Sequence, residues 1–423
     1  MSVAVKQRVA FHTLGCKLNQ AETELLAWRF AEAGYHVAGG DMGDVCVINT
    51  CTVTHVADRK SRHLLRLLRK RNPGALIVAT GCYAERAPQE LAEIGADLVV
   101  GNEQKMEITD LVKDRSASAA YCSTEGSVVN GLNRVRSFIK IQDGCSDCCA
   151  YCVVPTVRRR EYCLSVAEVI SEVKARTSAG YKEVVLTGTE IGAYKYGEAN
   201  LRHLVEQILA DTDVERVHLS SLQPQEISAE LLNLWRDSRL CRHFHLALQS
   251  GSDAVLHRMR RRYSIADYER AISSIRETVP DAAITTDGMV GFPGESGDEF
   301  EESYRFCRQI GLADIHVFAF SPRPGTSAVK MPVQVGDRLK KARSLQMLGL
   351  AQRSACEFRE RFLGQNTTVL WEKEVTPGSG VYSGLSDNHI RVFAESDQTL
   401  TNQLLGVRLV GPHKQGLWGK IIK

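Results

Sequence analysis

The stretch that decides the fold is IKIQDGCSDCCAYC, residues 139–152. An apolar, strand-like run leads into a loop on which Cys145, Cys149 and Cys152 follow one another in a C-x3-C-x2-C spacing. Three thiolates on one loop can hold three irons of a 4Fe–4S cube and leave the fourth iron open to an outside ligand. Cys148 lies inside the loop and is a competing ligand. The alternative is a zinc loop, which would require a fourth ligand close by.

Downstream of this loop, apolar runs alternate with helical stretches as far as residue 362. Six strand candidates cover residues 137–142, 183–188, 216–221, 244–249, 283–291 and 314–320. Six β/α units predict a partial (β/α)6 barrel whose functional loops lie at the carboxyl ends of the strands. Ser165 followed by Glu168 predicts a capping box at the first helix. We expect the helical stretch 337–362 to lie outside the sheet or to link onward.

Upstream, the chain has the same alternation on a smaller scale. Four apolar runs cover residues 9–15, 44–50, 75–81 and 96–102, with helical patterns between them, which predicts a parallel α/β sheet. Cys16, Cys51 and Cys82 each follow one of these runs, so they should converge at one sheet edge. Any one of them taken alone is better explained as a small buried residue. Three equivalent placements favour a second metal site.

The last sixty residues change character. Short β-rich runs at 367–375, 380–384, 390–396, 404–410 and 416–423 predict a small all-β barrel. Its Tyr382, His389, Arg391, Phe393 and Trp418 either stack on bases or line the barrel core. Residues 114–130, rich in Ser, Gly and Ala, predict a linker between the first two regions.

Composition limits the class of protein. The 423 residues are 43% hydrophobic and 24% charged, and no apolar run is long enough to span a membrane. The first residues lack the features of a signal peptide, so we expect a cytoplasmic protein. Thirteen cysteines, an odd number, then favour metal binding over a disulfide framework. A net charge of +3 does not by itself demand a nucleic-acid partner.

The motifs resemble a known family along nearly the whole chain. The cysteine loop is similar to that of radical S-adenosylmethionine (SAM) enzymes. TLGCKLNQAETE (13–24), INTCTVT (48–54) and ATGCYAE (79–85) resemble the amino-terminal domain of methylthiotransferases. The β-rich end resembles the RNA-binding TRAM domain. The resemblance implies a methylthiotransferase domain at 1–122, a radical SAM core at 131–362 and a TRAM domain at 364–423. The motifs around the first two cysteines are most similar to the MtaB subfamily.

That subfamily implies an activity. Its members insert a methylthio group at C2 of N6-threonylcarbamoyladenosine at position 37 of tRNA, using SAM and two 4Fe–4S clusters. The implied partners are the tRNA anticodon loop and a one-electron donor similar to flavodoxin or ferredoxin. The resemblance leaves two alternative substrates, isopentenyladenosine in tRNA and an aspartate of a ribosomal protein. A remote alternative is a zinc-containing RNA-binding protein without radical chemistry.

The resemblance also implies site residues. The metal ligands are Cys16, Cys51, Cys82, Cys145, Cys149 and Cys152. The SAM contacts are Tyr151, Thr187, Gly188, Glu190, Ser220, Ser221, Gln249, Val290 and Phe292. Independently of the resemblance, the basic clusters after the cluster loop and after the strand at 244–249 predict RNA contacts at Arg158, Arg160, Arg260, Arg261 and Arg262. The remaining cysteines match no ligand position and are interpreted as structural: Cys46, Cys122, Cys163, Cys241, Cys307 and Cys356.

One departure from the family concerns the segment after the cluster loop. The family usually has glycine where this chain has Arg159, which puts the local backbone conformation in question. No side chain is predicted to act as a general acid or base, because the chemistry resides in the clusters.

Overall fold

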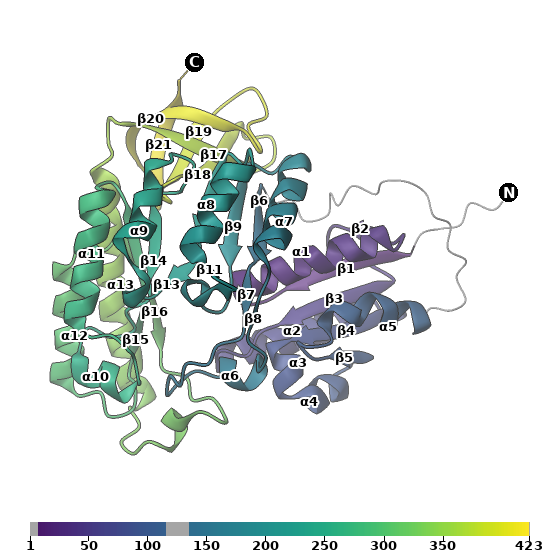
Figure 1. Cartoon of the computed structure of the whole chain (residues 1–423). Coiled ribbons are helices and arrows are strands. Elements are labelled where there is room, and N and C mark those ends of the chain that lie inside the picture. The colour runs from purple at the N-terminus through teal and green to yellow at the C-terminus, as the bar shows by residue number, and fades with distance from the viewer. Residues whose placement is uncertain (1–6, 116–134, 423) are drawn as a thin grey trace. The chain divides into compact units, whose positions relative to one another are not determined.

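The computed structural model describes residues 7–115 and 135–422 (Figure 1). They belong to two compact units, each described by itself. The first unit joins the chain up to residue 133 with residues 142–162 and 321–326. The second comprises residues 134–141, 163–320 and 327–423. Cys122, the predicted boundaries at 122 and 131, and the predicted linker beyond residue 115 lie outside the described residues.

The first unit is built on a parallel sheet of five strands in the order β2-β1-β3-β4-β5. The strands are β1 (Arg8–Thr13), β2 (His36–Ala38), β3 (Val45–Thr50), β4 (Leu76–Gly81) and β5 (Leu98–Val100). The four predicted strands are confirmed. The edge strand β2 was not predicted, because it begins with the exposed His36 and does not belong to a longer apolar run, unlike the equally short β5.

Helices cover both faces of this sheet. They are α1 (Lys17–Glu32), α2 (His55–Arg71), α3 (Cys82–Arg86), α4 (Pro88–Glu93), η1 (Lys105–Glu107) and α5 (Ile108–Arg115). Because successive strand residues point to opposite faces, β3 serves two cores. Val45 and Val47 join the core with α1 and α5. Cys46 and Ile48 join the core with α2 and α4. Cys46 is fully buried, as predicted.

The first unit also contains the segment that carries the second cysteine triplet. Its regular elements are β7 (Gln142–Asp143) and α6 (Val154–Val157), and β8 (Tyr162–Cys163) begins at its end. Most of the segment is loop, which leaves its backbone dependent on contacts with the rest of the unit.

The second unit contains the predicted β/α region. One parallel sheet has the order β12-β9-β6, and another has the order β13-β14-β15-β16. The strands are β6 (Arg136–Lys140), β9 (Glu183–Thr187), β12 (Arg216–Leu219), β13 (Ser221–Leu222), β14 (His243–Leu246), β15 (Ala283–Val290) and β16 (Asp314–Ala319). All six predicted strands are present, and their order along the chain is their order in space.

The long helices of this unit alternate with its strands. They are α7 (Val166–Ser178), α8 (Leu201–Asp211), α10 (Asp253–Arg258), α11 (Ile265–Thr278), α12 (Gly297–Gln309) and α13 (Asp337–Glu360). The shorter elements are η3 (Ile191–Ala193), β10 (Lys195–Tyr196), β11 (Ala199–Asn200), η4 (Pro224–Glu226), α9 (Ala229–Leu232), η5 (Asn233–Arg236) and η6 (Ser327–Lys330). Ser165 and Glu168 form the predicted capping box on α7. The helix α13 packs against β15, β16 and α12.

The carboxyl end of the chain is a closed five-stranded barrel, drawn in yellow in Figure 1, with the order β17-β18-β19-β21-β20. Its strands are β17 (Asn366–Glu374), β18 (Val381–Ser386), β19 (Arg391–Glu395), β20 (Leu404–His413) and β21 (Gly416–Ile421). The predicted all-β domain is therefore confirmed. Trp371 is fully buried in its core, together with Tyr382 and with Phe358 and Phe362, which lie at and just beyond the end of α13.

No helix in residues 7–115 or 135–422 is long and apolar enough to cross a membrane.

Candidate active site

The first cysteine triplet lies at one edge of the five-stranded sheet. Cys16 is the N-cap residue of α1, directly after β1. Cys51 follows β3, and Cys82 begins α3 directly after β4. These three strands are neighbours, so their carboxyl ends meet. Gly15 is required for the close approach: a Cβ atom there would lie 2.8 Å from Sγ of Cys51, and its φ is +101°.

The three thiols influence one another electrostatically. Burial, together with the neighbouring Cys16 and Cys82, raises the pKa of Cys51 to about 12. Cys16 is partly open to solvent, yet crowding around its thiol raises its pKa too. Arg158 opposes that rise and Cys82 adds to it. Three thiols that repel one another as thiolates are a donor set that a cluster of positive irons would stabilise.

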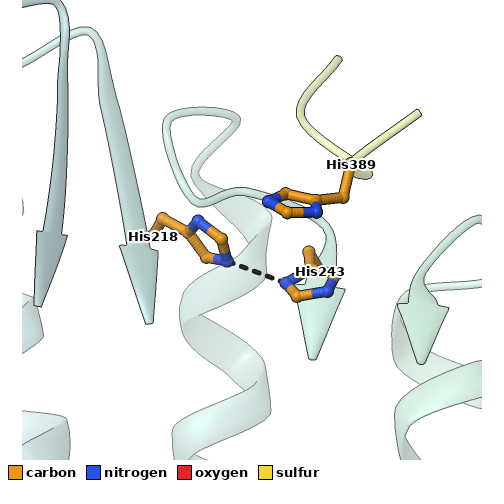
Figure 2. Close-up of side chains that lie close together, drawn as sticks. All are labelled: His218, His243 and His389. Atoms are coloured by element: carbon orange, nitrogen blue, oxygen red, sulfur yellow. Dashed lines mark hydrogen bonds between the residues drawn. The ribbon is translucent and has the colours of Figure 1, made fainter. Parts of the chain in front are cut away.

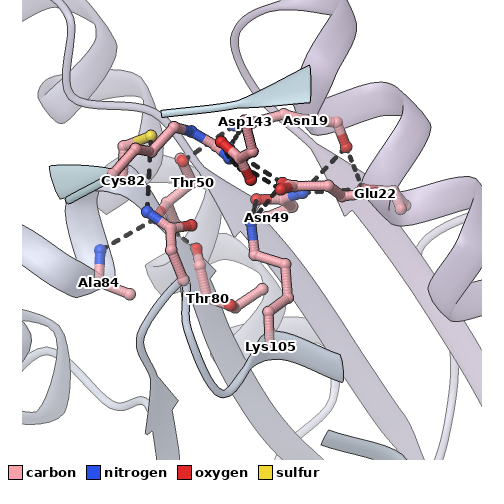
Figure 3. Close-up of polar contacts among 12 residues, drawn as sticks. Asn19, Glu22, Asn49, Thr50, Thr80, Cys82, Ala84, Lys105 and Asp143 are labelled. Atoms are coloured by element: carbon pink, nitrogen blue, oxygen red, sulfur yellow. Dashed lines mark hydrogen bonds and ion pairs between the residues drawn. The ribbon is translucent and has the colours of Figure 1, made fainter. Parts of the chain in front are cut away.

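A buried network of polar side chains lies next to this triplet (Figure 3). Asn19 and Glu22 lie one helical turn apart on α1 and are 1–2% exposed. Asn19 accepts from the Cys16 thiol at 3.9 Å and donates to the carbonyl oxygens of Leu14 and Thr50 at 2.8 and 3.1 Å. It therefore joins the residues before Cys16 and before Cys51. Partners of this kind orient ligating side chains.

Arg158 is the central cation of the network. Its guanidinium donates to Glu22 at 2.8 Å, to Asp143 at 2.7 Å and to Asn19 at 3.0 Å. Lys105 forms an ion pair with the same Glu22. Burial lowers the pKa of Lys105 in spite of Glu22. At Arg158 the effect of burial is outweighed, chiefly by Glu22, and the pKa rises.

This placement corrects the prediction that Arg158 contacts RNA. The residue is only 5% exposed, and its guanidinium is already bound to two carboxylates. A phosphate could reach it only by breaking those ion pairs. Arg158 instead holds the segment that carries the second cysteine triplet against α1.

The second triplet lies on that segment, within the same unit. Cys145, Cys149 and Cys152 are partly buried, and Cys148 is exposed. The backbone of Gly144 has a φ of +79°, and a Cβ atom there would lie 2.5 Å from the carbonyl oxygen of Arg160. Val153, the residue after Cys152, packs with Val157 and Cys82. The two triplets are therefore connected by direct packing.

The other cysteines play no part in these contacts. No disulfide is present among the described cysteines. Cys241 and Cys307 are buried in the second unit, as expected of structural residues. Cys163 is partly buried, and Cys356 is exposed on α13, where its thiol donates to Glu360 at 3.3 Å.

Two of the predicted RNA contacts can be described further. Arg160 is exposed, and its guanidinium lies over the Tyr162 ring, 5.9 Å from the centroid. Arg261 donates to Gln223 at 2.6 Å and lies over the ring of Tyr263. Arg260 and Arg262 are exposed. Arg159, which replaces the family glycine, does not adopt a positive φ, so this conformation does not require glycine.

The predicted SAM contacts of the second unit lie at the carboxyl ends of its parallel strands. Thr187 ends β9, and Gly188 and Glu190 follow it. Ser220 and Ser221 follow β12, Gln249 follows β14, and Val290 ends β15. Tyr151 is part of the first unit, on the loop of the second triplet. The chain thus gathers its predicted polar contacts along one edge of these sheets.

Gln249 has two features of a ligand-binding residue. Its backbone adopts a φ of +68°, which is unusual for a residue with a side chain. Its side-chain oxygen is buried and has no hydrogen-bond partner among the described residues. An unpaired buried acceptor favours a donor from a bound molecule, such as a hydroxyl or amino group of SAM.

The loop after β15 is held from behind. The Glu295 carboxylate accepts from the backbone N–H of Gly291 and from Arg343 of α13, the latter at 2.7 Å. Burial raises the pKa of Glu295, although Arg343 opposes that rise. Phe292 is fully buried and contacts Phe320 edge to face. The position of this loop is thus fixed by residues that the sequence did not point to.

The structure also groups three residues that were not predicted. His245 on β14 and His316 on β16 lie 3.4 and 3.5 Å from the carboxylate oxygens of Asp287 on β15. Burial opposes ionisation of Asp287, but the two imidazoles outweigh it and hold its pKa well below the usual range. The sequence could have indicated this group only if the pairing of β14, β15 and β16 had been known, because the three residues lie on these adjacent strands.

Comparison with known families defines the class. Residues 139–307 match the Radical SAM superfamily, and residues 8–101 match the Uncharacterized protein family UPF0004. The first match contains the second cysteine triplet and all of the predicted SAM contacts, from Tyr151 to Phe292. The chain is a radical SAM enzyme.

Whole-chain relatives narrow this class. The threonylcarbamoyladenosine tRNA methylthiotransferase MtaB of Aquifex aeolicus is 39% identical, over 86% of this chain and 92% of that protein. The MtaB of Bacillus subtilis is 32% identical, over 98% of this chain and 97% of that protein. The tRNA-2-methylthio-N(6)-dimethylallyladenosine synthase of Thermodesulfovibrio yellowstonii is 28% identical over 98% of both chains. The chain belongs to the methylthiotransferase family of radical SAM enzymes.

Solved structures agree at the level of the fold. The radical SAM methyltransferase TsrM of Kitasatospora setae, with cobalamin and a [4Fe-4S] cluster bound, has a TM-score of 0.53 and 15% identity. That likeness covers 90% of this chain and 81% of the other. As a radical SAM methylthiotransferase, the enzyme uses SAM and two 4Fe–4S clusters. The two converging cysteine triplets fit that requirement.

Proposed function

We propose that this enzyme inserts a methylthio group at C2 of N6-threonylcarbamoyladenosine in the anticodon loop of tRNA. The observation that carries the proposal is the joint support of two cysteine triplets by one compact unit, through Arg158 and through the contact between Cys82 and Val153. One triplet, Cys145, Cys149 and Cys152, leaves an iron open for SAM. The other, with Cys16, Cys51 and Cys82, is the sulfur-inserting site.

The division of work follows from this assignment. When bound, the clusters and SAM supply the radical and the methylthio chemistry. The side chains of this protein bind and orient those groups. Asn19, Asn49 and Asn102 fix the backbone around the first triplet, and Asn102 also donates to the carbonyl oxygen of Val157 at 2.7 Å. The buried acceptor of Gln249 and the loop held by Glu295 serve the SAM side.

The barrel offers a surface suited to single-stranded RNA. The His413 ring lies between those of Phe393 and Trp418, with a centroid distance of 4.8 Å to each. The ammonium group of Lys414 lies 5.8 Å from the Phe393 ring. His413 and Trp418 are partly exposed. Aromatic rings beside a cation are the usual means of binding unpaired bases without strict sequence preference.

The choice of nucleoside rests on charge. A cavity of about 440 Å³ is lined by Leu14, Arg59, Lys60, His63 and Leu64. Arg59, Lys60 and His63 are exposed, and none has an ion-pair partner among the described residues. Leu14 lies two residues before Cys16, and the lining of the cavity is mostly apolar, with the cations Arg59 and Lys60 beside it. The threonylcarbamoyl group carries a carboxylate that these cations would pair with, whereas the isopentenyl group carries no charge.

Mass spectrometry of tRNA nucleosides tests the substrate. In a strain that lacks the gene, the methylthio form of threonylcarbamoyladenosine should disappear, and the plasmid-borne gene should restore it. Loss of the methylthio isopentenyladenosine instead would show that the other nucleoside is the substrate. Unchanged tRNA with an unmodified ribosomal-protein aspartate would support the third alternative.

Paired cysteine variants test the two clusters. Replacing Cys149 with Ala should abolish SAM cleavage and remove about half of roughly eight irons per chain. Replacing Cys51 with Ala should remove a similar amount of iron, leave SAM cleavage measurable and stop thiomethylation. Cys46→Ala, at a buried cysteine outside both triplets, is the control. Full thiomethylation by Cys51→Ala would exclude the second cluster at this position.

The remaining assignments follow from this function. The proposed domains are residues 1–122 for the sulfur-inserting cluster, 131–362 for SAM and 364–423 for RNA. Arg160, Arg260, Arg261 and Arg262 are proposed phosphate contacts. The enzyme would act in the cytoplasm with a flavodoxin-like or ferredoxin-like electron donor.

A further inference from the structure

Three histidines from three separate elements meet in the second unit (Figure 2). His218 lies on β12, His243 begins β14, and His389 lies in the turn between β18 and β19. One ring nitrogen of each lies within 4.8 Å of the corresponding nitrogens of the other two. None of these residues belongs to the cysteine triplets or to the predicted SAM contacts.

Two of these rings have polar partners on both ring nitrogens. Nε2 of His218 and Nδ1 of His243 share a hydrogen bond of 2.8 Å, so one of the two nitrogens carries a proton that a bound ion would replace. The opposite nitrogens face outward: Nδ1 of His218 lies 3.6 Å from Glu183, and Nε2 of His243 lies 3.0 Å from the Thr285 hydroxyl. A carboxylate or hydroxyl on the far nitrogen is the usual way in which a protein fixes the tautomer of a ligating histidine.

The third ring is presented by a well-anchored turn. His389 has a φ of +65°, a left-handed backbone that few residues other than Gly, Asn, Asp and His adopt. The Ser386 hydroxyl accepts from the backbone N–H of Ile390 at 2.9 Å, and Asp387 forms an ion pair with Arg242. The His389 ring stacks on that of His243 with centroids 4.2 Å apart. The turn therefore holds an imidazole beside two others.

The charges around the three histidines favour one metal ion bound by neutral imidazoles over several protonated imidazoles. His218 and His243 are 1% and 4% exposed, and Arg216 already lies 3.8 Å from the nearby Glu183 carboxylate. Protonating several of these imidazoles would concentrate positive charge beside that guanidinium, with one carboxylate to balance it. Neutral imidazoles are the form that binds metals, and one ion would take the place of the proton shared between His218 and His243.

We propose that His218, His243 and His389 bind one divalent transition-metal ion, and that this ion is zinc. Three neutral imidazoles without a thiolate are a donor set that zinc accepts, with nitrogen ligands at about 2.0–2.1 Å. In a tetrahedral site such nitrogens are about 3.3 Å apart, so the pair now 2.8 Å apart opens slightly on binding. Water occupies the fourth position. The ion fastens the β18–β19 turn of the barrel to β12 and β14.

The test uses the full chain, purified anaerobically with its iron–sulfur clusters. Elemental analysis should find about one zinc per chain in addition to about eight irons. X-ray absorption at the zinc edge should show nitrogen ligands near 2.0 Å and no sulfur shell near 2.3 Å, the distance expected for zinc on cysteine. This measurement needs no variant, so it holds even where a substitution harms folding.

Two matched variants locate the ion. His389→Asn should lose the zinc while keeping its iron, because asparagine tolerates the same left-handed backbone. His257→Asn, at an exposed histidine of α10, should keep both metals. Chelator treatment should lower the melting temperature of the wild type to that of His389→Asn. Absence of zinc from the wild type after Zn²⁺ addition, a sulfur-dominated spectrum, or full zinc in His389→Asn would each overturn the proposal.

Discussion

At the scale of single residues, Arg158 shows that an arginine in a basic motif can be buried in ion pairs instead of being exposed to bind RNA. Three consecutive arginines follow the cluster loop, and Arg158 and Arg160 were both predicted to contact RNA. In the structure Arg158 is enclosed between Glu22 and Asp143, whereas Arg159 and Arg160 remain exposed. The difference arises from partners 136 and 15 positions away along the chain, which local patterns do not show.

Arg158→Met should therefore destabilise the first unit. Removing the cation leaves two buried carboxylates with less compensation, which costs about 3–5 kcal/mol. Urea unfolding under anaerobic, reducing conditions, followed by circular dichroism, measures the loss. Arg159→Met is the matched control, since that side chain is exposed and makes one hydrogen bond, to a backbone carbonyl. Equal stability of the two variants would refute the role assigned to Arg158.

His12 predicts a pH dependence of stability. Burial lowers its pKa from 6.5, although Asp41 opposes that change, and its Nε2 has no hydrogen-bond partner among the described residues. The folded state keeps this ring neutral at a pH where the unfolded chain binds a proton. Its contribution to stability is thus fully present above pH 6.5 and is lost progressively as the pH falls below that value.

The expected result is a difference between two histidine variants. Between pH 6.5 and 5 the wild type should lose up to about 1 kcal/mol more per pH unit than His12→Gln. His36→Gln, at an exposed position of β2, should behave as the wild type does. Urea midpoints measured across this pH range provide the comparison. A parallel decline in all three proteins would show that His12 does not contribute.

At the scale of elements, helix α7 offers a quantitative test of local sequence signals. Ser165 accepts from the backbone N–H of Glu168, whose carboxylate accepts from the Ser165 backbone at 2.7 Å. Ser165→Ala should lower the free energy of unfolding by about 1 kcal/mol, because a backbone donor at the helix start loses its partner. Ser171→Ala, on the exposed side of the same helix, should have little effect. Thermal unfolding of both variants compares them.

Elements were also the scale at which the sequence was most informative. Apolar runs bounded by turn residues located β1, β3, β4 and β5, six of the seven parallel strands of the β/α region (all but the two-residue β13) and all five barrel strands. They succeeded because each run is long enough for burial to impose a pattern. The strand β2 belongs to no such run and begins with an exposed histidine, so it was missed. Cysteine positions were informative because they follow strands whose ends must meet.

The supporting residues could not be predicted, because their partners are distant in sequence. Glu22 contacts Lys105, 83 positions away, and Gln249 depends on its backbone bridge with Gly288. One signal was available: Asn19 and Glu22 are polar residues three apart on a helix that must bury a face. Buried polar residues at that spacing, close to a cysteine, indicate a supporting network.

At the scale of the whole molecule, tRNA binding should depend on salt through specific cations. The double variant Arg59→Ala with Lys60→Ala should weaken binding and reduce the slope of log affinity against log salt by roughly 1–2. Arg305→Ala is the control, because that exposed arginine is paired with Glu301 on α12. Filter binding across a salt series measures the slopes. If the slope changed equally in the double variant and in Arg305→Ala, the cavity would not be part of the RNA-binding surface.

The first compact unit has one more consequence, for how such enzymes can be recombined. It is assembled from three separate stretches of chain, so no single cut in the gene isolates it. A chimera that joins residues 1–133 of this protein to the remainder of a distant relative would pair Glu22 with a foreign counterpart of Arg158. Exchange at the apparent domain boundary should therefore yield hybrids that lose the inner ion pairs. Viable hybrids should be those in which residues 142–162 are transferred along with the amino-terminal segment.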